Sequence, residues 1–131
     1  MPELPEVESI KRSLSSNIVG QKLKAYKIYD HRTNRYNSKK PTINESLLGI
    51  SRKGKLLIFD FEDYSIIFHL GMSGRIQVND KKNKHTRARF YFDKDNVNFD
   101  DIRRFGFIKI IKAELKICLL YTSDAADDVA S

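Results

Sequence analysis

The sequence predicts a mainly β domain with one helix at its N-terminus. Apolar residues recur at helical spacing in the first twenty positions, and short apolar runs separated by turn-forming residues occupy most of the rest. The chain has 131 residues, which is about the length of one domain. Short strands with frequent turns are typical of a β-sandwich or a β-barrel, and the pattern leaves both open.

The helix is expected to begin at Pro5, because the missing N–H of proline costs nothing in the first turn. Val7, Ile10 and Leu14 then lie on one face of the helix, and Gly20 is the expected stop. The terminus is therefore tied to an amphipathic helix, and residue 2 is held next to it.

The rest of the chain predicts strands and loops in alternation. The expected elements are a strand at 22–30, a long polar loop at 31–46, a strand around 56–61, a strand at 64–78 that breaks at Gly71 and Gly74, a charged loop at 79–85, and strands in RARFYFDKD, NVNFDD and GFIKIIKA.

The composition indicates a basic intracellular protein. There are 24 basic and 17 acidic residues, for a formal charge of +7. We find no apolar run long enough to span a membrane and no secretory signal. Cys118 is the single cysteine, so the sequence predicts neither a disulfide framework nor a cysteine zinc site. Nucleic acid is one partner that such a charge favours, although many basic surfaces are only solvated.

The last residues differ in composition from the rest. The segment CLLYTSDAADDVAS (118–131) has no basic residue, and CLLYTSDAAD resembles the translation of a transposase adapter used in sequencing libraries. We expect 117–131 to be a non-native tail, with an ordinary acidic tail as the alternative; sequencing of the natural locus tests this. The tail's charged residues are three aspartates, so without it 24 basic residues face 14 acidic ones, a formal charge of +10.

Four segments interrupt the strand pattern: PELPEVE at the start, SRKGK (51–55), HLGMSGR (69–75) and DDIRRFGF (100–107). Together, in this order and spacing, they resemble the formamidopyrimidine-DNA glycosylase family of bacterial base-excision enzymes. The resemblance covers residues 2–116, which correspond to the family's N-terminal catalytic domain. It implies a two-layer β-sandwich flanked by the N-terminal helix, forming one lobe of a two-lobe enzyme with DNA in the cleft.

By this resemblance Pro2 is the catalytic nucleophile, once Met1 has been removed. An α-amino group has a pKa of about 7.7–8.0, well below that of lysine, so much more of it is unprotonated at neutral pH. Such an amine can attack the deoxyribose of a damaged nucleotide, displace the base and form a Schiff base that leads to β- and δ-elimination. The alternative is a proline that only opens the helix.

The resemblance also assigns roles to two acidic residues. Glu3 would move protons at the sugar ring oxygen, as a general acid–base. Glu6 would organise the N-terminus and the sugar. Both also suit the start of a helix, where the dipole favours negative charge, so for Glu6 both roles can hold.

In SRKGK, Lys55 matches the family's active-site lysine and would contact the phosphate at the lesion. Lys53 is the alternative in a different register, and a merely basic hairpin is a further one. Gly54 permits a sharp turn beside it.

In HLGMSG, two glycines allow a tight exposed turn with Met72 at its tip. An apolar side chain on a basic surface suggests insertion into a base stack, where a thioether can fill the space of an extruded nucleotide. Packing of Met72 in the core is the alternative. His69 is expected to be structural.

DDIRRFGF supplies the partner of Met72. Arg103 matches the family residue that reads the orphaned base, and Phe105 matches the aromatic that stacks beside it. Arg104 is expected to meet phosphate or an acid such as Asp100 or Asp101. His85 matches a family histidine that contacts phosphate. Ile102 stands where the family usually has proline, which puts the loop geometry in question.

The family's helix–two-turn–helix unit and its four-cysteine zinc finger have no counterpart in this sequence. We therefore expect no cofactor in this part, with zinc only in the second half of the full-length family. The resemblance implies a glycosylase and AP lyase that removes oxidised purines from damaged double-stranded DNA, with impaired activity in a fragment. It also implies a cytoplasmic bacterial monomer that is associated with the nucleoid. The alternatives are a non-catalytic damaged-DNA-binding module and an endonuclease VIII-like glycosylase for oxidised pyrimidines. An RNA-binding β-domain is disfavoured, because this sequence lacks the paired aromatic residues on which such sheets stack bases.

Overall fold

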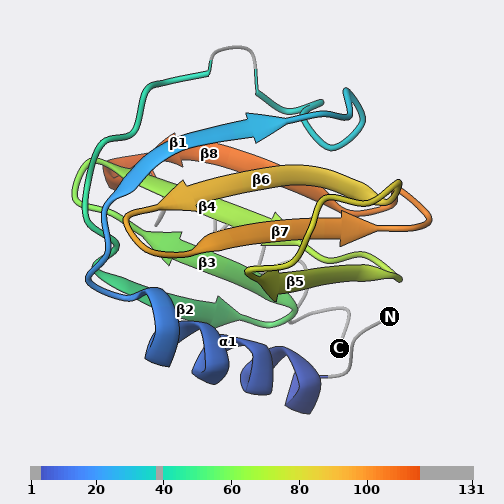
Figure 1. Ribbon diagram of the computed structural model, residues 1–131, viewed down its shortest axis with the longest axis horizontal. Helices are drawn as coiled ribbons and strands as arrows, with labels where there is room; N and C mark the ends of the chain where they lie inside the picture. Colours follow the sequence, from blue (N-terminus) through green and yellow to red (C-terminus); the bar gives the residue numbers. More distant parts are fainter. Residues whose placement is uncertain (1–3, 38–39, 116–131) are drawn as a thin grey trace.

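Two four-stranded sheets and one helix make up the computed structural model, which describes residues 4–37 and 40–115 (Figure 1). The elements are α1 (Leu4–Ile18), β1 (Leu23–Ile28), β2 (Gly49–Lys53), β3 (Leu56–Asp60), β4 (Tyr64–His69), β5 (Gly74–Val78), β6 (Thr86–Phe92), β7 (Asn96–Asp101) and β8 (Phe107–Lys112).

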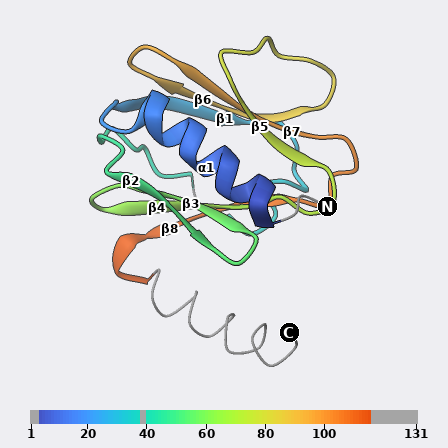
Figure 2. The same ribbon diagram turned by 90° about the horizontal axis from the view of Figure 1, so that it is seen from below.

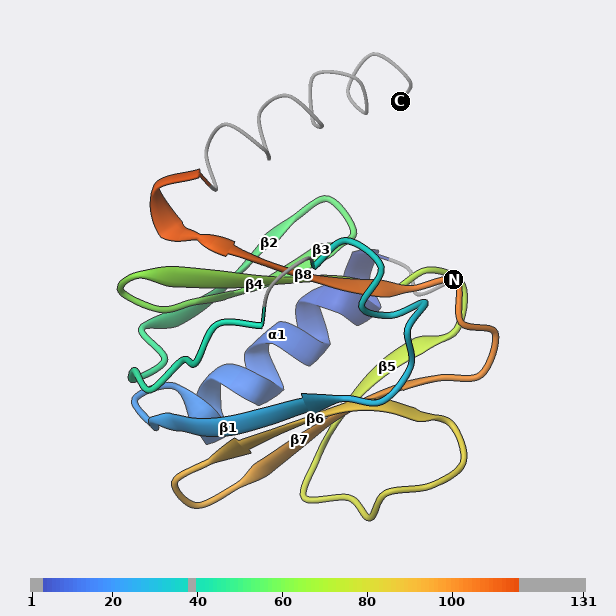
Figure 3. The same cartoon turned by 90° about the horizontal axis from the view of Figure 1, so that it is seen from above.

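The strands pair only with antiparallel neighbours, in the orders β1-β6-β7-β5 and β2-β3-β4-β8. The two sheets lie face to face as separate layers (Figure 3). The expected two-layer β-sandwich is confirmed, and the barrel alternative is wrong.

Aromatic side chains from both sheets meet in the core. Phe68 on β4 lies with its ring centroid 4.7 Å from that of Phe59 on β3. It also lies 5.4 Å from Phe90 on β6 and 6.0 Å from Phe99 on β7, which belong to the other sheet. All four rings are fully buried. Burial of this apolar surface is the main force that holds the two sheets together.

Helix α1 follows the expected pattern. Val7, Leu14 and Ile18 are buried in the same core, and Gly20 has a φ of +94° just beyond the last helical residue. A glycine adopts this left-handed conformation without the clash that a Cβ would cause, so it suits the end of a helix. The helix packs beside β2 and runs across the open side between the two sheets (Figure 2).

Two strand expectations need correction. The segment 51–55 was expected to interrupt the strands, but Ser51, Arg52 and Lys53 form the end of β2, which pairs along its whole length with β3. The segment 64–78 was expected as one broken strand. It is two strands in different sheets, because the chain leaves β4 at His69 and enters β5 of the opposite layer at Gly74.

The polar loop after β1 covers the edge of the second sheet at β8. The Asn37 amide donates to the carbonyl of Ile108 (2.7 Å), and its Oδ1 accepts from the Ile110 N–H (2.9 Å). The Ile108 N–H donates to the Thr33 carbonyl (3.0 Å). The loop therefore satisfies backbone groups that an open edge strand would leave unpaired. In the part of the chain that the structure describes, no helix is long and apolar enough to cross a membrane.

Candidate nucleic-acid interface

Two loops cross side by side between the sheets at one end of the sandwich. One loop (70–73) joins β4 to β5, and the other (102–106) joins β7 to β8. The strands that they leave and enter are paired, since His69 lies opposite Phe107 in one sheet and Gly74 opposite Asp101 in the other. The register of both sheets therefore brings the two loops together.

The close approach of the loops requires glycine. A Cβ on Gly71 would lie 2.8 Å from the backbone nitrogen of Gly106, and a Cβ on Gly106 would lie 2.5 Å from the carbonyl oxygen of His69. Gly71 also has a φ of +62°. Backbone atoms cannot rotate away as a side chain can, so larger residues at these positions would separate the loops.

Both loops expose apolar side chains at this end. Met72 is 49% exposed and Phe105 is 53% exposed. The Arg103 Nη1 lies 3.7 Å from the Met72 sulfur. We call Met72, Arg103 and Phe105 the wedge. The alternative that Met72 packs in the core is wrong. Met72 and Phe105, which the resemblance assigns to base-stack insertion, and Arg103, which it assigns to reading the orphaned base, lie on the two adjacent loops.

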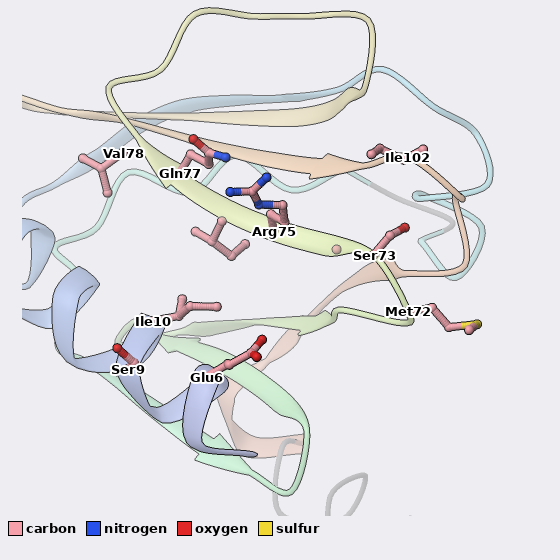
Figure 4. Close-up of a pocket in the computed structure, with 11 residues that line it drawn as sticks. Glu6, Ser9, Ile10, Met72, Ser73, Arg75, Gln77, Val78 and Ile102 are labelled. Carbon is pink, nitrogen blue, oxygen red and sulfur yellow. The ribbon is translucent and has the colours of Figure 1, made fainter. Parts of the chain in front are cut away.

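An open cavity of about 750 Å³ lies between α1 and β5 next to the wedge. Glu6, Ser9 and Ile10 line it from the helix, and Arg75 and Gln77 line it from the strand (Figure 4). Met72 and Ile102 border its end. Glu6 therefore faces a space bounded by the loop that carries Met72, and its role in organising an active site stays a prediction.

Lys55 lies at the same end of the sandwich. It follows Gly54, whose φ of +57° turns the chain between β2 and β3. The next residue, Leu56, pairs with His69, the last residue before loop 70–73. The hairpin that carries Lys55 therefore ends beside that loop, whereas Lys53 closes β2.

His85 reaches the same end from the other sheet. It precedes Thr86, which pairs with Asp100, and its carbonyl oxygen accepts a hydrogen bond from the Asp101 N–H (2.9 Å). Its side chain is half-buried. Figure 1 shows the start of α1, the end of β2 and the start of β6 on one side of the molecule.

Arg104 pairs with an acid, as one of the two expectations had it, but the acid is neither Asp100 nor Asp101, and a contact with phosphate stays a prediction. Its Nε lies 3.1 Å from the Asp30 carboxylate. Asp30 is buried and also lies 3.7 Å from the Arg87 Nη1. The backbone of Arg104 has a φ of +62°, a left-handed conformation that is uncommon for residues other than glycine.

His69 makes the kind of contacts expected of a structural residue, and its role stays a prediction. Its ring stacks on that of Phe107 at a centroid distance of 4.8 Å, and its Nδ1 accepts from the Gly71 N–H (3.2 Å). Pro2 and Glu3 lie outside the described residues, so their roles stay predictions. Among the residues that are described, no group of three or more His, Cys, Asp or Glu side chains is arranged to hold a metal ion.

Sequence reasoning missed two residues that join the loops, Ser73 and Asp101. Ser73 donates a hydrogen bond to the Asp101 carboxylate. A signal was present, because a serine stands in the glycine-flanked turn and an aspartate ends the strand before the second loop. Their pairing depends on the sheet register, which the local pattern does not specify.

The comparisons with known proteins agree with this geometry. The sequence model described as the formamidopyrimidine-DNA glycosylase N-terminal domain matches residues 1–108. This chain belongs to that family. It is 39% identical over 125 residues to a formamidopyrimidine-DNA glycosylase of Rickettsia conorii, across 88% of this chain and 45% of the relative. It is 35% identical over 121 residues to that of Lactococcus lactis subsp. cremoris, across 87% and 44%.

The family likeness extends to solved structures. The Lactococcus lactis formamidopyrimidine-DNA glycosylase bound non-covalently to DNA with an AP site matches with a TM-score of 0.80 and 31% identity, over 92% of this chain and 49% of that one. The same enzyme in complex with DNA containing FAPY-dG matches equally well, with a TM-score of 0.80 over 48% of its length. The chain thus spans about half the length of the relatives it matches.

Proposed function

We propose that this chain forms the damage-probing and catalytic lobe of a DNA glycosylase with AP-lyase activity that acts on oxidised purines in duplex DNA. The observation that carries the proposal is the wedge, in which two loops from opposite sheets present Met72, Arg103 and Phe105 together. Apolar side chains that enter a base stack offset part of the few kcal/mol that extrusion of a nucleotide costs. An arginine between them can hydrogen-bond the edge of the base left behind.

The surroundings of the wedge suit a phosphate backbone. Lys55 and His85 approach from separate sheets at the same end, and the chain as a whole carries a formal charge of +7. The relatives with this fold include one solved with AP-site DNA and with FAPY-dG DNA, which supports the same class of ligand here. Because the matched relatives are bacterial, we infer a location in the bacterial cytoplasm.

In the proposed reaction the Pro2 nitrogen attacks the anomeric carbon, and the bond from that carbon to the base breaks. The departing base takes a proton, and ring opening leaves an iminium joined to the protein. Glu3 gives the ring oxygen its proton. The iminium makes the C2′ proton acidic, and its loss to solvent gives an enamine whose electrons expel the 3′ phosphate as the C3′–O bond breaks. Loss of a second proton, from C4′, expels the 5′ phosphate as the C5′–O bond breaks. Glu6 lies in the first turn of α1, where it faces the cavity and can order the preceding residues and the sugar.

The proposal is tested by the ratio of affinities for two duplexes that differ only by one abasic-site analogue. We expect the chain to prefer the abasic duplex, and Met72→Ala to reduce that preference by about tenfold or more, since burial of a methionine side chain contributes about 1.5–3 kcal/mol. Leu48→Ala is the matched control, because Leu48 is a large apolar side chain that is 63% exposed on another part of the surface. Equal affinity of the chain for the two duplexes would refute the proposal.

A non-catalytic damaged-DNA-binding module is the second candidate. The wedge supports it, because Met72, Arg103 and Phe105 can probe a base stack without any chemistry at Pro2 or Glu3. Incubation with abasic-site DNA and borohydride separates the two functions. An enzyme leaves a covalent adduct, which retention of Met1 should abolish by blocking the proline nitrogen. Binding without any adduct favours the module.

A further inference from the structure

Asp101 occupies the point where the two wedge loops meet. It is the last residue of β7 and is fully buried (0% exposed). Its Oδ1 accepts a hydrogen bond from the Ser73 hydroxyl (2.5 Å), and its Oδ2 accepts one from the Gly106 N–H (2.8 Å). One carboxylate therefore joins loop 70–73 to the far end of loop 102–106.

Ser73 links the Asp101 carboxylate to the other end of loop 102–106. While its hydroxyl donates to Asp101, its oxygen accepts a hydrogen bond from the Arg103 N–H (3.0 Å). Both ends of loop 102–106, at Arg103 and at Gly106, are thus linked through Ser73 and Asp101 to the loop that carries Met72. An ionised carboxylate only accepts hydrogen bonds, so it can satisfy the two donors at once.

The backbone of Asp101 is itself held. Its N–H donates to the His85 carbonyl (2.9 Å), and its carbonyl oxygen accepts from the buried Arg87 Nε (2.9 Å). A hydrogen bond to a charged group is about twice as strong as a neutral one. These bonds fix the position of Asp101 independently of the two loops that its carboxylate joins.

The geometry points to Asp101 as the positioning residue that makes the two loops one rigid wedge, so that Met72, Arg103 and Phe105 enter a damaged site together. This inference rests on the proposed function and adds how the wedge is held. A loop that must be ordered on binding loses backbone entropy, and a preorganised wedge avoids that loss.

Ser73→Ala tests the coupling without DNA. The substitution removes the bonds to Arg103 and to one oxygen of Asp101, but it leaves the bond from Gly106 to the other oxygen untouched. We expect amide hydrogen exchange to become about fivefold to tenfold faster at Gly106 as well as at Arg103, corresponding to the loss of one net hydrogen bond. Faster exchange at Arg103 alone would overturn the inference.

Ser65→Ala is the matched control. Ser65 is buried and donates to the carboxylate of Asp60 (3.3 Å), at the end of β4 opposite to loop 70–73. This variant also loses a serine–aspartate hydrogen bond, so it reports the effect of reduced stability alone. Exchange at Gly106 should stay at the wild-type rate after correction for any global change. A rise equal to that of Ser73→Ala would contradict a local coupling.

A second arm measures the preference for the abasic duplex. Ser73→Ala should lower this preference about fivefold to tenfold while affinity for intact duplex stays within about twofold, because phosphate contacts do not depend on the wedge. An unchanged preference together with faster exchange would overturn the positioning role. If the unaltered chain shows no preference at all, the proposed function fails, and the exchange arm still decides the coupling.

Discussion

Gly74→Ala is the substitution to which the interface should be most sensitive. Gly74 is the first residue of β5, and its N–H donates to the Leu70 carbonyl across the loop that carries Met72 (2.7 Å). A Cβ at this position would lie 2.3 Å from that carbonyl oxygen, and 2.8 and 2.9 Å from the Cα and the carbonyl carbon of Leu70. All three are backbone atoms, so no rotamer change can relieve the clash.

The size of the effect follows from these distances. Ordinary contacts of a Cβ begin at 3.4 Å, so the backbone at Leu70 must move by about 1 Å. Overpacking of this kind costs about 1–3 kcal/mol. Loss of the hydrogen bond from Gly74 adds about 0.5–1.5 kcal/mol. Together these give a decrease of about 1.5–4.5 kcal/mol in the free energy of unfolding.

Urea unfolding of the 131-residue chain measures this difference, with Gly49→Ala as the matched control. Gly49 is also the first residue of a strand, but a Cβ there would meet nothing within 4 Å. Its replacement should leave the free energy of unfolding unchanged or raise it by about 0.5–1 kcal/mol. The reasoning is refuted if Gly74→Ala unfolds within about 0.5 kcal/mol of the unaltered chain.

Three further outcomes are expected. Asn37→Ala should lower the free energy of unfolding by about 1–3 kcal/mol in urea titrations, since it leaves two backbone groups of β8 without partners; no change would mean that water replaces the amide. Hydrogen bonds from Asn79 and Gln21 lower the pKa of Asp95, so its charged form stabilises the fold above its ordinary pKa of about 3.9, and this stability is lost as the pH falls through the lowered value. Asp95→Asn should therefore lose stability less steeply in acid unfolding below about pH 4, and an unchanged slope would contradict this. Duplex affinity, measured by fluorescence anisotropy, should fall roughly 40-fold between about 50 and 200 mM salt if about three phosphates are contacted, and a flat response would exclude a phosphate-binding surface.

The sequence predicted the elements whose signals are local. The helical spacing of Val7, Ile10 and Leu14 indicated α1, and the glycines around Met72 indicated an exposed turn. These features depend on residues within a few positions of one another, so periodicity and backbone sterics are enough to find them.

Features that depend on sheet register were not predicted. Nothing in the segment 64–78 shows that its two strands enter different sheets, because the glycines between them indicate a turn but not the sheet that the second strand joins. The pairing of Arg104 with Asp30, and of Ser73 with Asp101, likewise joins residues far apart in the sequence. Such contacts follow from the assembled sandwich, and local patterns carry no information on them.

The central claim is that Met72 and Phe105 occupy the gap in a base stack at a damaged site. The most direct measurement places 2-aminopurine, which fluoresces more strongly when unstacked, opposite an abasic-site analogue in a duplex. The account predicts a rise in fluorescence on addition of the chain, a much smaller rise with the double variant Met72→Ala and Phe105→Ala at saturating protein, and a full rise with Leu48→Ala. An equal rise for the double variant and the unaltered chain would contradict the claim.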